Sequence, residues 1–304
     1  MAMDSLFDRA LATARQLGAS DIHLKPGMEP ILRIDGELRT LRSPDVSPLA
    51  RDPLSRDFLH NLAMSLLNDR RRDILERVGD VTVALTTSSG TRQRVHISQH
   101  RGGMSISLHL VPPEAPALDS LGLPAGARDL VAPGAGFVLI AGGPGEGKTT
   151  TLAALIDDLT SRQPVRVITI EDPVEIVLRD RVGVVIQREV GLDVPSIAAG
   201  LRASARQDME VLMIGEIGDR ESAELALAAA ENGRLVLVGV SAPNPAAAVT
   251  RLVGLWETEA RTAVRARLAA TLRGVLHQKL VTVKGRKGRK AEAQVVTGAA
   301  AASS

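Results

Sequence analysis

The order of apolar and polar residues changes near residue 120. Before that point they alternate in short segments, which is typical of antiparallel strands with one exposed face. After it, continuous apolar runs alternate with segments of helical periodicity, which is the pattern of a mostly parallel sheet covered by helices. We therefore predict an α/β fold in which a small α+β domain precedes a larger domain with a parallel sheet.

The first part of the chain predicts a small sheet with two helices. Asp35-Gly36 is a strong hairpin signal, because a two-residue turn of this kind needs residues that tolerate positive φ. The helices are expected at residues 5–17 and Phe58–Leu67, and the strands at Ile31–Ile34, Glu37–Leu41, Val81–Leu85, Arg92–Ser98 and Ser105–Leu110.

The second part predicts buried strands that alternate with helices. Ser196 and Asp219 are expected to cap two of these helices, because their side-chain oxygens can accept the free N–H groups of a first turn. The strands are expected at Phe137–Ala141, Val165–Ile170, Val211–Ile214 and Leu235–Val240. The helices are expected at Leu152–Leu159, from Ser196 toward Arg206, from Asp219 through Glu231, and at Thr258–Leu280.

A proline-rich segment, residues 112–120, separates the two parts. Proline fixes φ and stiffens a chain, so this segment is interpreted as an interdomain linker. The two domains then cover residues 1–111 and 121–297. The tail at 298–304 consists of Gly, Ala and Ser and is predicted to be disordered.

The strand at Phe137–Ala141 is followed by a phosphate-loop pattern, G-x-x-x-x-G-K-[ST]. Its glycines let several backbone N–H groups point at one anion, and the next helix presents its positive end to the phosphates. Lys148 can reach the β- and γ-phosphates, and the Thr149 hydroxyl can bind Mg²⁺. We therefore predict a nucleoside triphosphate site formed by Gly142, Gly143, Pro144, Gly145, Glu146, Gly147, Lys148, Thr149 and Thr150.

Three carboxylates follow two of the other predicted strands: Glu171, Asp172 and Glu216. Ligands of open α/β sheets bind beyond the carboxyl ends of the strands. We expect these strands to flank the phosphate loop, where carboxylates can hold Mg²⁺ through water and orient an attacking water. A helix cap or a surface ion pair remains the alternative for each of them.

Composition narrows the class of protein. The formal net charge is only +2. Aromatic residues make up 1% of the chain, so stacking platforms for nucleic acid are nearly absent. The absence of cysteine excludes disulfides and cysteine-bound zinc. No apolar run approaches the roughly 18 residues of a membrane span. These features predict a cytoplasmic protein that neither inserts into a membrane nor binds nucleic acid, with a solvated basic loop at Lys284–Lys290.

With these motifs in order, the chain resembles the secretion ATPases of type II secretion and type IV pili. It is most similar to the PilT-type pilus retraction ATPases. The resemblance extends from about residue 10 to Val296. It rests on ASDIHLKPG (19–27), ILRIDGELR (31–39), TIEDPVE (169–175), IQREVG (186–191), LRASARQDMEVLMIGEIGD (201–219), ELALAAAENG (224–233) and LRGVLHQKL (272–280).

The resemblance implies a PAS-like N-terminal domain and a RecA-like ATPase domain that uses ATP and Mg²⁺. It also implies a hexameric ring that docks on an inner-membrane pilus or secretion platform, together with other ATPases of the same machine. Glu171 would orient or activate the water, and Glu216 would assist at the metal with Thr149. Arg94 and Arg101 match arginines that reach the phosphates from the N-terminal domain, although either could be a solvated strand residue.

Several positions depart from the family pattern. Arg234 and Ser241 replace two histidines, which are expected beside the γ-phosphate. His109 and Gly218 each replace an arginine, and Glu146 brings a carboxylate into the phosphate loop. These departures keep a second interpretation open, a nucleotide-binding regulatory or structural paralogue with weak or no ATPase activity. A nucleic-acid motor has only the basic loop and the RecA-like core in its favour.

Overall fold

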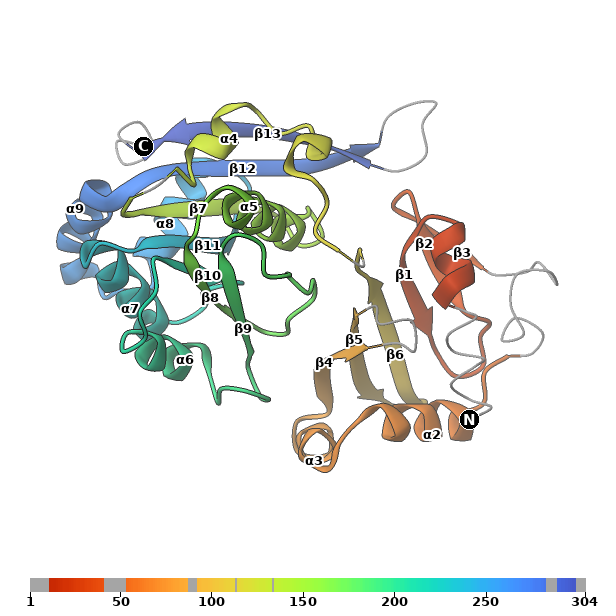
Figure 1. Cartoon of the computed structure of the whole chain (residues 1–304). Helices are drawn as coiled ribbons and strands as arrows, with labels where there is room; N and C mark the ends of the chain where they lie inside the picture. The colour runs from red at the N-terminus through yellow and green to blue at the C-terminus, as the bar shows by residue number, and fades with distance from the viewer. Residues whose placement is uncertain are drawn as a thin grey trace. The chain divides into compact units, whose positions relative to one another are not determined.

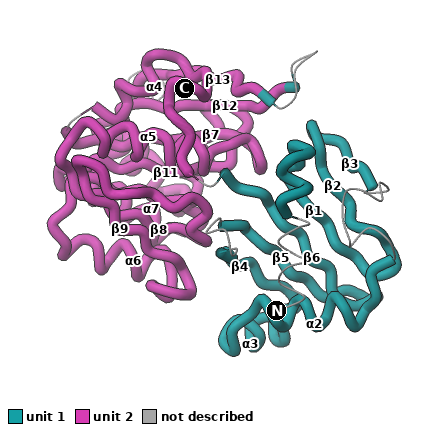
Figure 2. Tube along the Cα trace, turned by 45° about the vertical axis from the view of Figure 1, so that its right-hand side comes forward, with its two compact units in different colours: residues 1–113, 282–289 teal, residues 114–281, 290–304 magenta. Residues whose placement is uncertain are grey.

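The computed structural model describes residues 11–40, 53–86, 92–112, 114–132, 134–282 and 289–298. The chain divides into two compact units (Figure 2). Unit 1 comprises residues 1–113 and 282–289, and unit 2 comprises residues 114–281 and 290–304. Within the described residues the chain forms two sheets, one of six strands and one of seven. The prediction of a mixed α/β fold with a smaller α+β part is confirmed.

The sheet of unit 1 has the order β3-β2-β1-β6-β5-β4, and all its neighbouring strands are antiparallel. Two helices pack on it, α2 against β6 and α3 against β4 (Figure 1). The strands are β1 (Ala19–Leu24), β2 (Ile31–Ile34), β3 (Glu37–Thr40), β4 (Asp80–Thr86), β5 (Arg92–His100) and β6 (Gly103–Leu110). The helices are α2 (Arg56–Leu66) and α3 (Asp69–Val78).

Local signals in unit 1 have the predicted effect. Asp35 and Gly36 have φ of 51° and 89°, so the turn between β2 and β3 places both residues in the left-handed region. Residues 11–16 are helical, and the chain leaves this helix through Gly18 at φ 73°. The rest of the helix predicted at 5–17 lies outside the described residues. The short polar helix α3 was not predicted, because only Arg71 and Leu75 in it are buried.

The sheet of unit 2 has the order β13-β12-β7-β11-β10-β8-β9 (Figure 1). From β12 to β9 every pair is parallel, and all seven residues of β7 are buried. The strands are β7 (Gly136–Gly142), β8 (Arg166–Glu171), β9 (Val184–Glu189), β10 (Val211–Ile214), β11 (Leu235–Ser241), β12 (Leu272–Thr282) and β13 (Arg289–Thr297).

Helices and short 3₁₀ turns surround this sheet. The helix α5 contacts β7, β11 and η2, whereas α7 and α8 contact both α9 and the strands β7 and β11 (Figure 1). These elements are η2 (Leu118–Leu121), α4 (Gly126–Asp129), α5 (Lys148–Arg162), α6 (Ile197–Ser204), α7 (Arg220–Glu231), α8 (Pro245–Val253), η3 (Thr258–Ala260) and α9 (Arg261–Thr271).

Two predicted helix caps are confirmed in unit 2. Ser196 accepts a hydrogen bond from the N–H of Ala199 at 3.1 Å, at the start of α6. Asp219 accepts one from the N–H of Ser222 at 2.8 Å, at the start of α7. Each bond satisfies an N–H group that has no partner inside its own helix.

The prediction of one helix over Thr258–Leu280 is wrong. After η3 and α9 the chain becomes the strand β12, in which Leu272 and Val275 pair with residues of β7 in parallel register. Burial between β7 and β13 stabilises a strand at these residues, and this outweighs the helical spacing of the leucines. A Cβ on Gly274 would lie 2.7 Å from the Val296 carbonyl, so glycine lets β13 approach closely.

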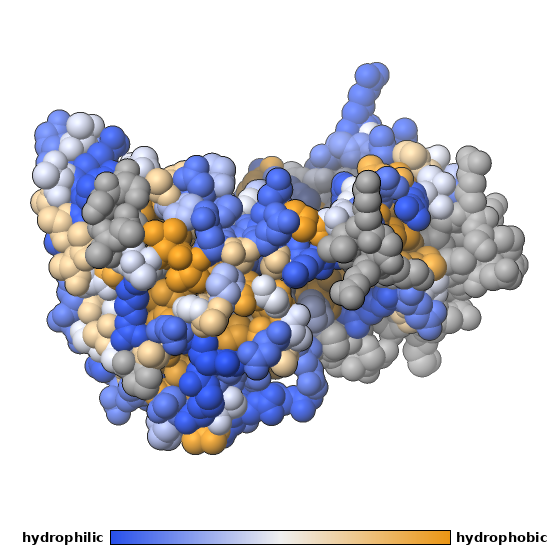
Figure 3. Space-filling model, turned by 90° about the horizontal axis from the view of Figure 1, so that it is seen from above, coloured by the Kyte–Doolittle hydropathy of each residue, from blue (hydrophilic) through white to orange (hydrophobic). Residues whose placement is uncertain are grey.

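The strands β1, β9 and β13 and the helices α4 and α8 were not predicted from the apolar pattern. The tail beyond residue 298 and the basic residues 283–288 lie outside the described residues. None of the described helices is long and apolar enough to cross a bilayer. Figure 3 shows one face of the molecule, on which apolar residues gather between charged ones.

Candidate nucleotide site

The phosphate-loop residues form the connection between β7 and α5. Gly145 and Gly147 have φ of 70° and 83°, in the left-handed region that glycine adopts without steric cost. Lys148, Thr149 and Thr150 form the first turn of α5 and are half-buried. The loop residues predicted to bind phosphate therefore surround the positive end of a helix that packs on a buried strand.

The Lys148 ammonium lies at the carboxyl edge of the sheet. Its Nζ donates to the carbonyl oxygens of Gly142 at 3.1 Å and Gly143 at 3.0 Å. It also donates to the Ser241 hydroxyl at 3.2 Å. Ser241 ends β11 and pairs with Gly142, so this hydroxyl stands at the phosphate loop.

Glu171 and Glu216 do not follow strands that flank the phosphate loop, and that expectation is wrong. The neighbours of β7 are β11 and β12, whereas β10 and β8 lie beyond β11. At roughly 4.8 Å per strand, β8 is about 14 Å from β7. Of the strands β7, β8, β10 and β11, β11 comes last in the sequence, yet it lies beside β7. Because these strands are parallel, their carboxyl ends still share one edge of the sheet.

The Glu171 carboxylate is deeply buried, with 4% of the residue exposed. The Thr169 hydroxyl donates to it at 2.6 Å and the Gln187 amide at 3.0 Å. Burial raises its pKa and these hydrogen bonds lower it, while the negative charges of Glu175 and Glu189 raise it further, to about 7. A carboxyl group that titrates near neutrality is suited to accept a proton from water.

Asp172 and Glu216 are exposed at the same edge, beyond the ends of β8 and β10. Among the described residues no group of three or more His, Asp or Glu side chains could hold a metal ion. Mg²⁺ is usually held by one or two protein oxygens together with phosphates and water. The Thr149 hydroxyl and the Glu216 carboxylate are protein oxygens of that kind.

Arg94 and Arg101 lie near opposite ends of β5 and are not brought together. Arg94 is half-buried and faces His109 across the pair with β6. Arg101 is exposed in the turn between β5 and β6, where it lines a hollow with Lys25, Arg56 and His100. At about 3.3 Å per residue the two arginines are roughly 23 Å apart along the strand.

Two other departures from the family pattern are His109, which lies beside a carboxylate, and Gly218, which is exposed. The His109 ring lies 2.9 Å from the Asp21 carboxylate and forms an ion pair with it when protonated. Burial would raise the pKa of Asp21, but hydrogen bonds from His109 and Ser20 lower it to about 2. Gly218 is exposed, and a Cβ there would meet nothing within 4 Å.

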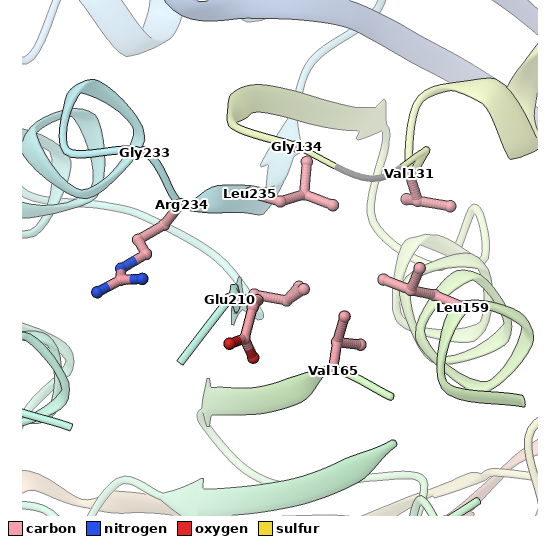
Figure 4. Close-up of a pocket in the computed structure, with 9 residues that line it drawn as sticks. Val131, Gly134, Leu159, Val165, Glu210, Gly233, Arg234 and Leu235 are labelled. Atoms are coloured by element: carbon pink, nitrogen blue, oxygen red, sulfur yellow. The ribbon is translucent and has the colours of Figure 1, made fainter. Parts of the chain in front are cut away.

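Arg234 does not lie beside the phosphate loop, contrary to the expectation for the two replaced histidines. It directly precedes β11, whose first residue, Leu235, pairs with Gly136 at the start of β7. Arg234 lines a cavity of about 180 Å³ together with Leu159 and Val165. Figure 4 shows these side chains. Arg234 therefore lies at the amino edge of the sheet, and Ser241 at the carboxyl edge.

The raised pKa of Glu171 predicts a pH dependence of stability. The folded chain holds this proton up to about pH 7, whereas the unfolded chain releases it near 4.5. The group therefore stabilises the fold below pH 4.5, and this contribution, about 3 kcal/mol, is lost as the pH rises through 7. Measured by urea unfolding, the free energy of unfolding should fall less between pH 5 and pH 8 for Glu171→Gln than for the unchanged chain. Equal losses would contradict this prediction.

The sequence profile of the type II/IV secretion system protein family matches residues 2–303. The chain belongs to this family. Two members are the uncharacterised protein YggR of Escherichia coli and the type IV pilus retraction ATPase PilT of Pseudomonas aeruginosa. YggR is 35% identical over 286 residues, 93% of this chain and 83% of that protein. PilT is 31% identical over 288 residues, 95% of this chain and 81% of that protein.

Solved structures of the family agree with the fold. The pilus retraction motor PilT with bound ADP superposes with a TM-score of 0.80 at 34% identity, over 94% of this chain and 81% of that one. The ATPase DotB of Legionella pneumophila gives a TM-score of 0.77 at 28% identity, over 97% of this chain and 81% of that one. The resemblance that the sequence motifs indicated is therefore confirmed.

Three polar residues of the site had no predicted role. Thr169 and Gln187 face each other across the pair of β8 and β9 and both donate to Glu171. Gln278, on β12, is buried against the phosphate loop. Thr169, Gln187 and Gln278 lie in family stretches quoted above, but their contacts depend on strand pairing that the sequence did not predict.

Proposed function

We propose that this chain is an ATP-hydrolysing motor subunit of a type IV pilus or type II secretion-like machine, with a role similar to pilus retraction by PilT. The observation that carries the proposal is a phosphate loop that shares the carboxyl edge of a parallel sheet with a buried carboxyl group of pKa about 7. The solved PilT motor, which is similar over 94% of this chain, has ADP bound.

In the proposed site each residue has one task. The loop N–H groups and Lys148 bind the β- and γ-phosphates. The Thr149 hydroxyl and Glu216, directly or through water, hold Mg²⁺, which neutralises phosphate charge when it is bound. Glu171 orients the attacking water and accepts its proton. Asp172 is exposed beside this edge and is given no catalytic task.

The proposed working form is a hexameric ring in the cytoplasm, docked on an inner-membrane platform protein beside other ATPases of the machine. In that ring Arg94 and Arg101 act on nucleotide that is bound mainly by another subunit or domain. ATP is proposed as the nucleotide because PilT and PilU of Pseudomonas aeruginosa are named as ATPases. No nucleic acid is proposed as a partner.

Lys148→Ala tests the nucleotide site. Loss of the ammonium removes the charge that the phosphates meet in the loop, so the affinity for Mg-ATP should fall at least tenfold, which is about 1.4 kcal/mol. Isothermal calorimetry measures the affinity, and phosphate release measures turnover. Lys290→Ala, an exposed lysine on β13, is the matched control.

The same experiment separates the two interpretations of the sequence. An unchanged affinity in Lys148→Ala would remove the phosphate-loop interpretation. Tight binding of Mg-ATP by the unchanged chain with turnover no higher than in Lys148→Ala would favour a regulatory or structural subunit over a motor.

A further inference from the structure

The strand β12 extends past the end of β7 and continues along the phosphate loop. The two strands pair up to His277 and Ala141. A Cβ on Gly142 would lie 2.7 Å from the Gln278 carbonyl oxygen. A Cβ on Gly147 would lie 3.0 Å from the Gln278 amide nitrogen. Gln278 therefore contacts both ends of the loop.

Two hydrogen bonds from β12 meet on a single loop residue, Glu146. The Gln278 amide Nε2 donates to the Glu146 carbonyl oxygen at 2.6 Å. The backbone N–H of Leu280 donates to the Glu146 carboxylate. One bond therefore fixes the backbone of the loop, and the other fixes its side chain.

The burial of Gln278 indicates that the first bond matters. Only 2% of this residue is exposed, and within the described residues its amide oxygen has no hydrogen-bond partner. Burying an amide whose oxygen accepts no hydrogen bond costs free energy. Within the described residues, the side-chain bond that offsets this cost is the one to Glu146.

We propose that Gln278 and Glu146 are positioning residues that clamp the phosphate loop onto β12 in the conformation that receives the phosphates. A loop with glycine at 142, 143, 145 and 147 loses much conformational freedom when it closes on a ligand. Holding it beforehand lowers that cost and tightens binding. The inference rests on the proposed function, because it assumes that the loop binds nucleotide.

The clamp reverses the effect expected from charge alone. A carboxylate that faced the phosphates would repel them, and its removal would tighten binding. In the structure the Glu146 carboxylate accepts an N–H from β12. Removal of the side chain should therefore weaken binding.

Three variants test the clamp: Glu146→Ala, Glu146→Gln and Gln278→Leu. Glu146→Ala and Gln278→Leu should each raise the Kd for Mg-ATP about 3–10-fold, since each loses one hydrogen bond. Glu146→Gln should bind more tightly than Glu146→Ala, because its amide oxygen can still accept from Leu280 and has no charge. Gln163→Leu, at the far end of α5, is the control.

Two readouts separate positioning from general stability. Without nucleotide, hydrogen exchange at residues 142–148 should be faster in Glu146→Ala and Gln278→Leu than in the control. In turnover assays KM should rise more than kcat falls. If Glu146→Ala unfolds at the assay temperature, Gln278→Leu provides the same comparison.

The results can overturn the clamp without touching the proposed function. Glu146→Ala or Gln278→Leu binding as tightly as the unchanged chain, while Lys148→Ala still loses binding, would overturn the clamp alone. Glu146→Gln binding as weakly as Glu146→Ala would also overturn it. Absence of Mg-ATP binding by the unchanged chain would overturn both.

Discussion

Glu171→Gln is expected to lower ATP turnover by roughly 10²–10⁴-fold, the usual contribution of a positioned general base. Glutamine keeps the shape of the side chain but cannot accept the proton of the attacking water. Affinity for Mg-ATP should change little, because Lys148 and the loop N–H groups bind the phosphates. Phosphate release at saturating ATP measures the loss, and calorimetry measures the affinity.

The pH dependence of ATP turnover tests the same assignment of Glu171. Glu171 acts as a base only when ionised, so turnover should rise as the pH increases through about 7. Glu175 is a buried neighbour whose negative charge helps to raise this pKa, so Glu175→Gln should shift the rise to lower pH. Turnover of Glu171→Gln within tenfold of the unchanged chain would contradict the assignment of Glu171 as the base.

Arg101→Ala is expected to lower turnover by roughly 10³–10⁵-fold, the range measured for arginines that reach a phosphoryl group from outside its own site. Within the described residues Arg101 is exposed, and no ion pair holds its side chain. Its charge is therefore available to a nucleotide bound elsewhere in an assembly. Phosphate release measures turnover, and Arg77→Ala, an exposed arginine on α3, is the control.

Mixing two inactive variants tests whether Arg101 acts on another subunit. Arg101→Ala retains an intact phosphate loop, and Lys148→Ala retains an intact Arg101. If the arginine works across a subunit boundary, mixed rings should regain part of the turnover that each variant has lost. No recovery in rings shown to exchange subunits, or full activity of a monomer, would contradict action between subunits.

Local features of the fold could be predicted from the sequence because neighbouring residues determine them. The turn at Asp35-Gly36 needs residues that tolerate positive φ, and both residues adopt it. The caps Ser196 and Asp219 each act within three residues of their own position. The phosphate loop likewise depends on consecutive residues between one strand and one helix.

Features that depend on strand pairing could not be predicted in this way. The apolar spacing of Thr258–Leu280 fits a helix, but residues 272–282 form a strand between β7 and β13, and Leu272, Val275 and Leu276 are buried there. The order of β7, β8, β10 and β11 along the chain does not reveal that β11 lies beside β7. The buried setting of Glu171 follows from the same pairing, since Gln187 reaches it from the neighbouring strand β9.

Arg234 and Ser241, which replace two histidines of the family pattern, lie at opposite ends of β11. Arg234 precedes its first residue and Ser241 is its last, so at about 3.3 Å per residue they are roughly 23 Å apart. Side chains at such a distance do not share partners, and their effects on free energy are expected to add. The effect of a change at position 234 on free energy is therefore expected to be the same whichever residue is at 241, and each substitution could have been acquired without the other.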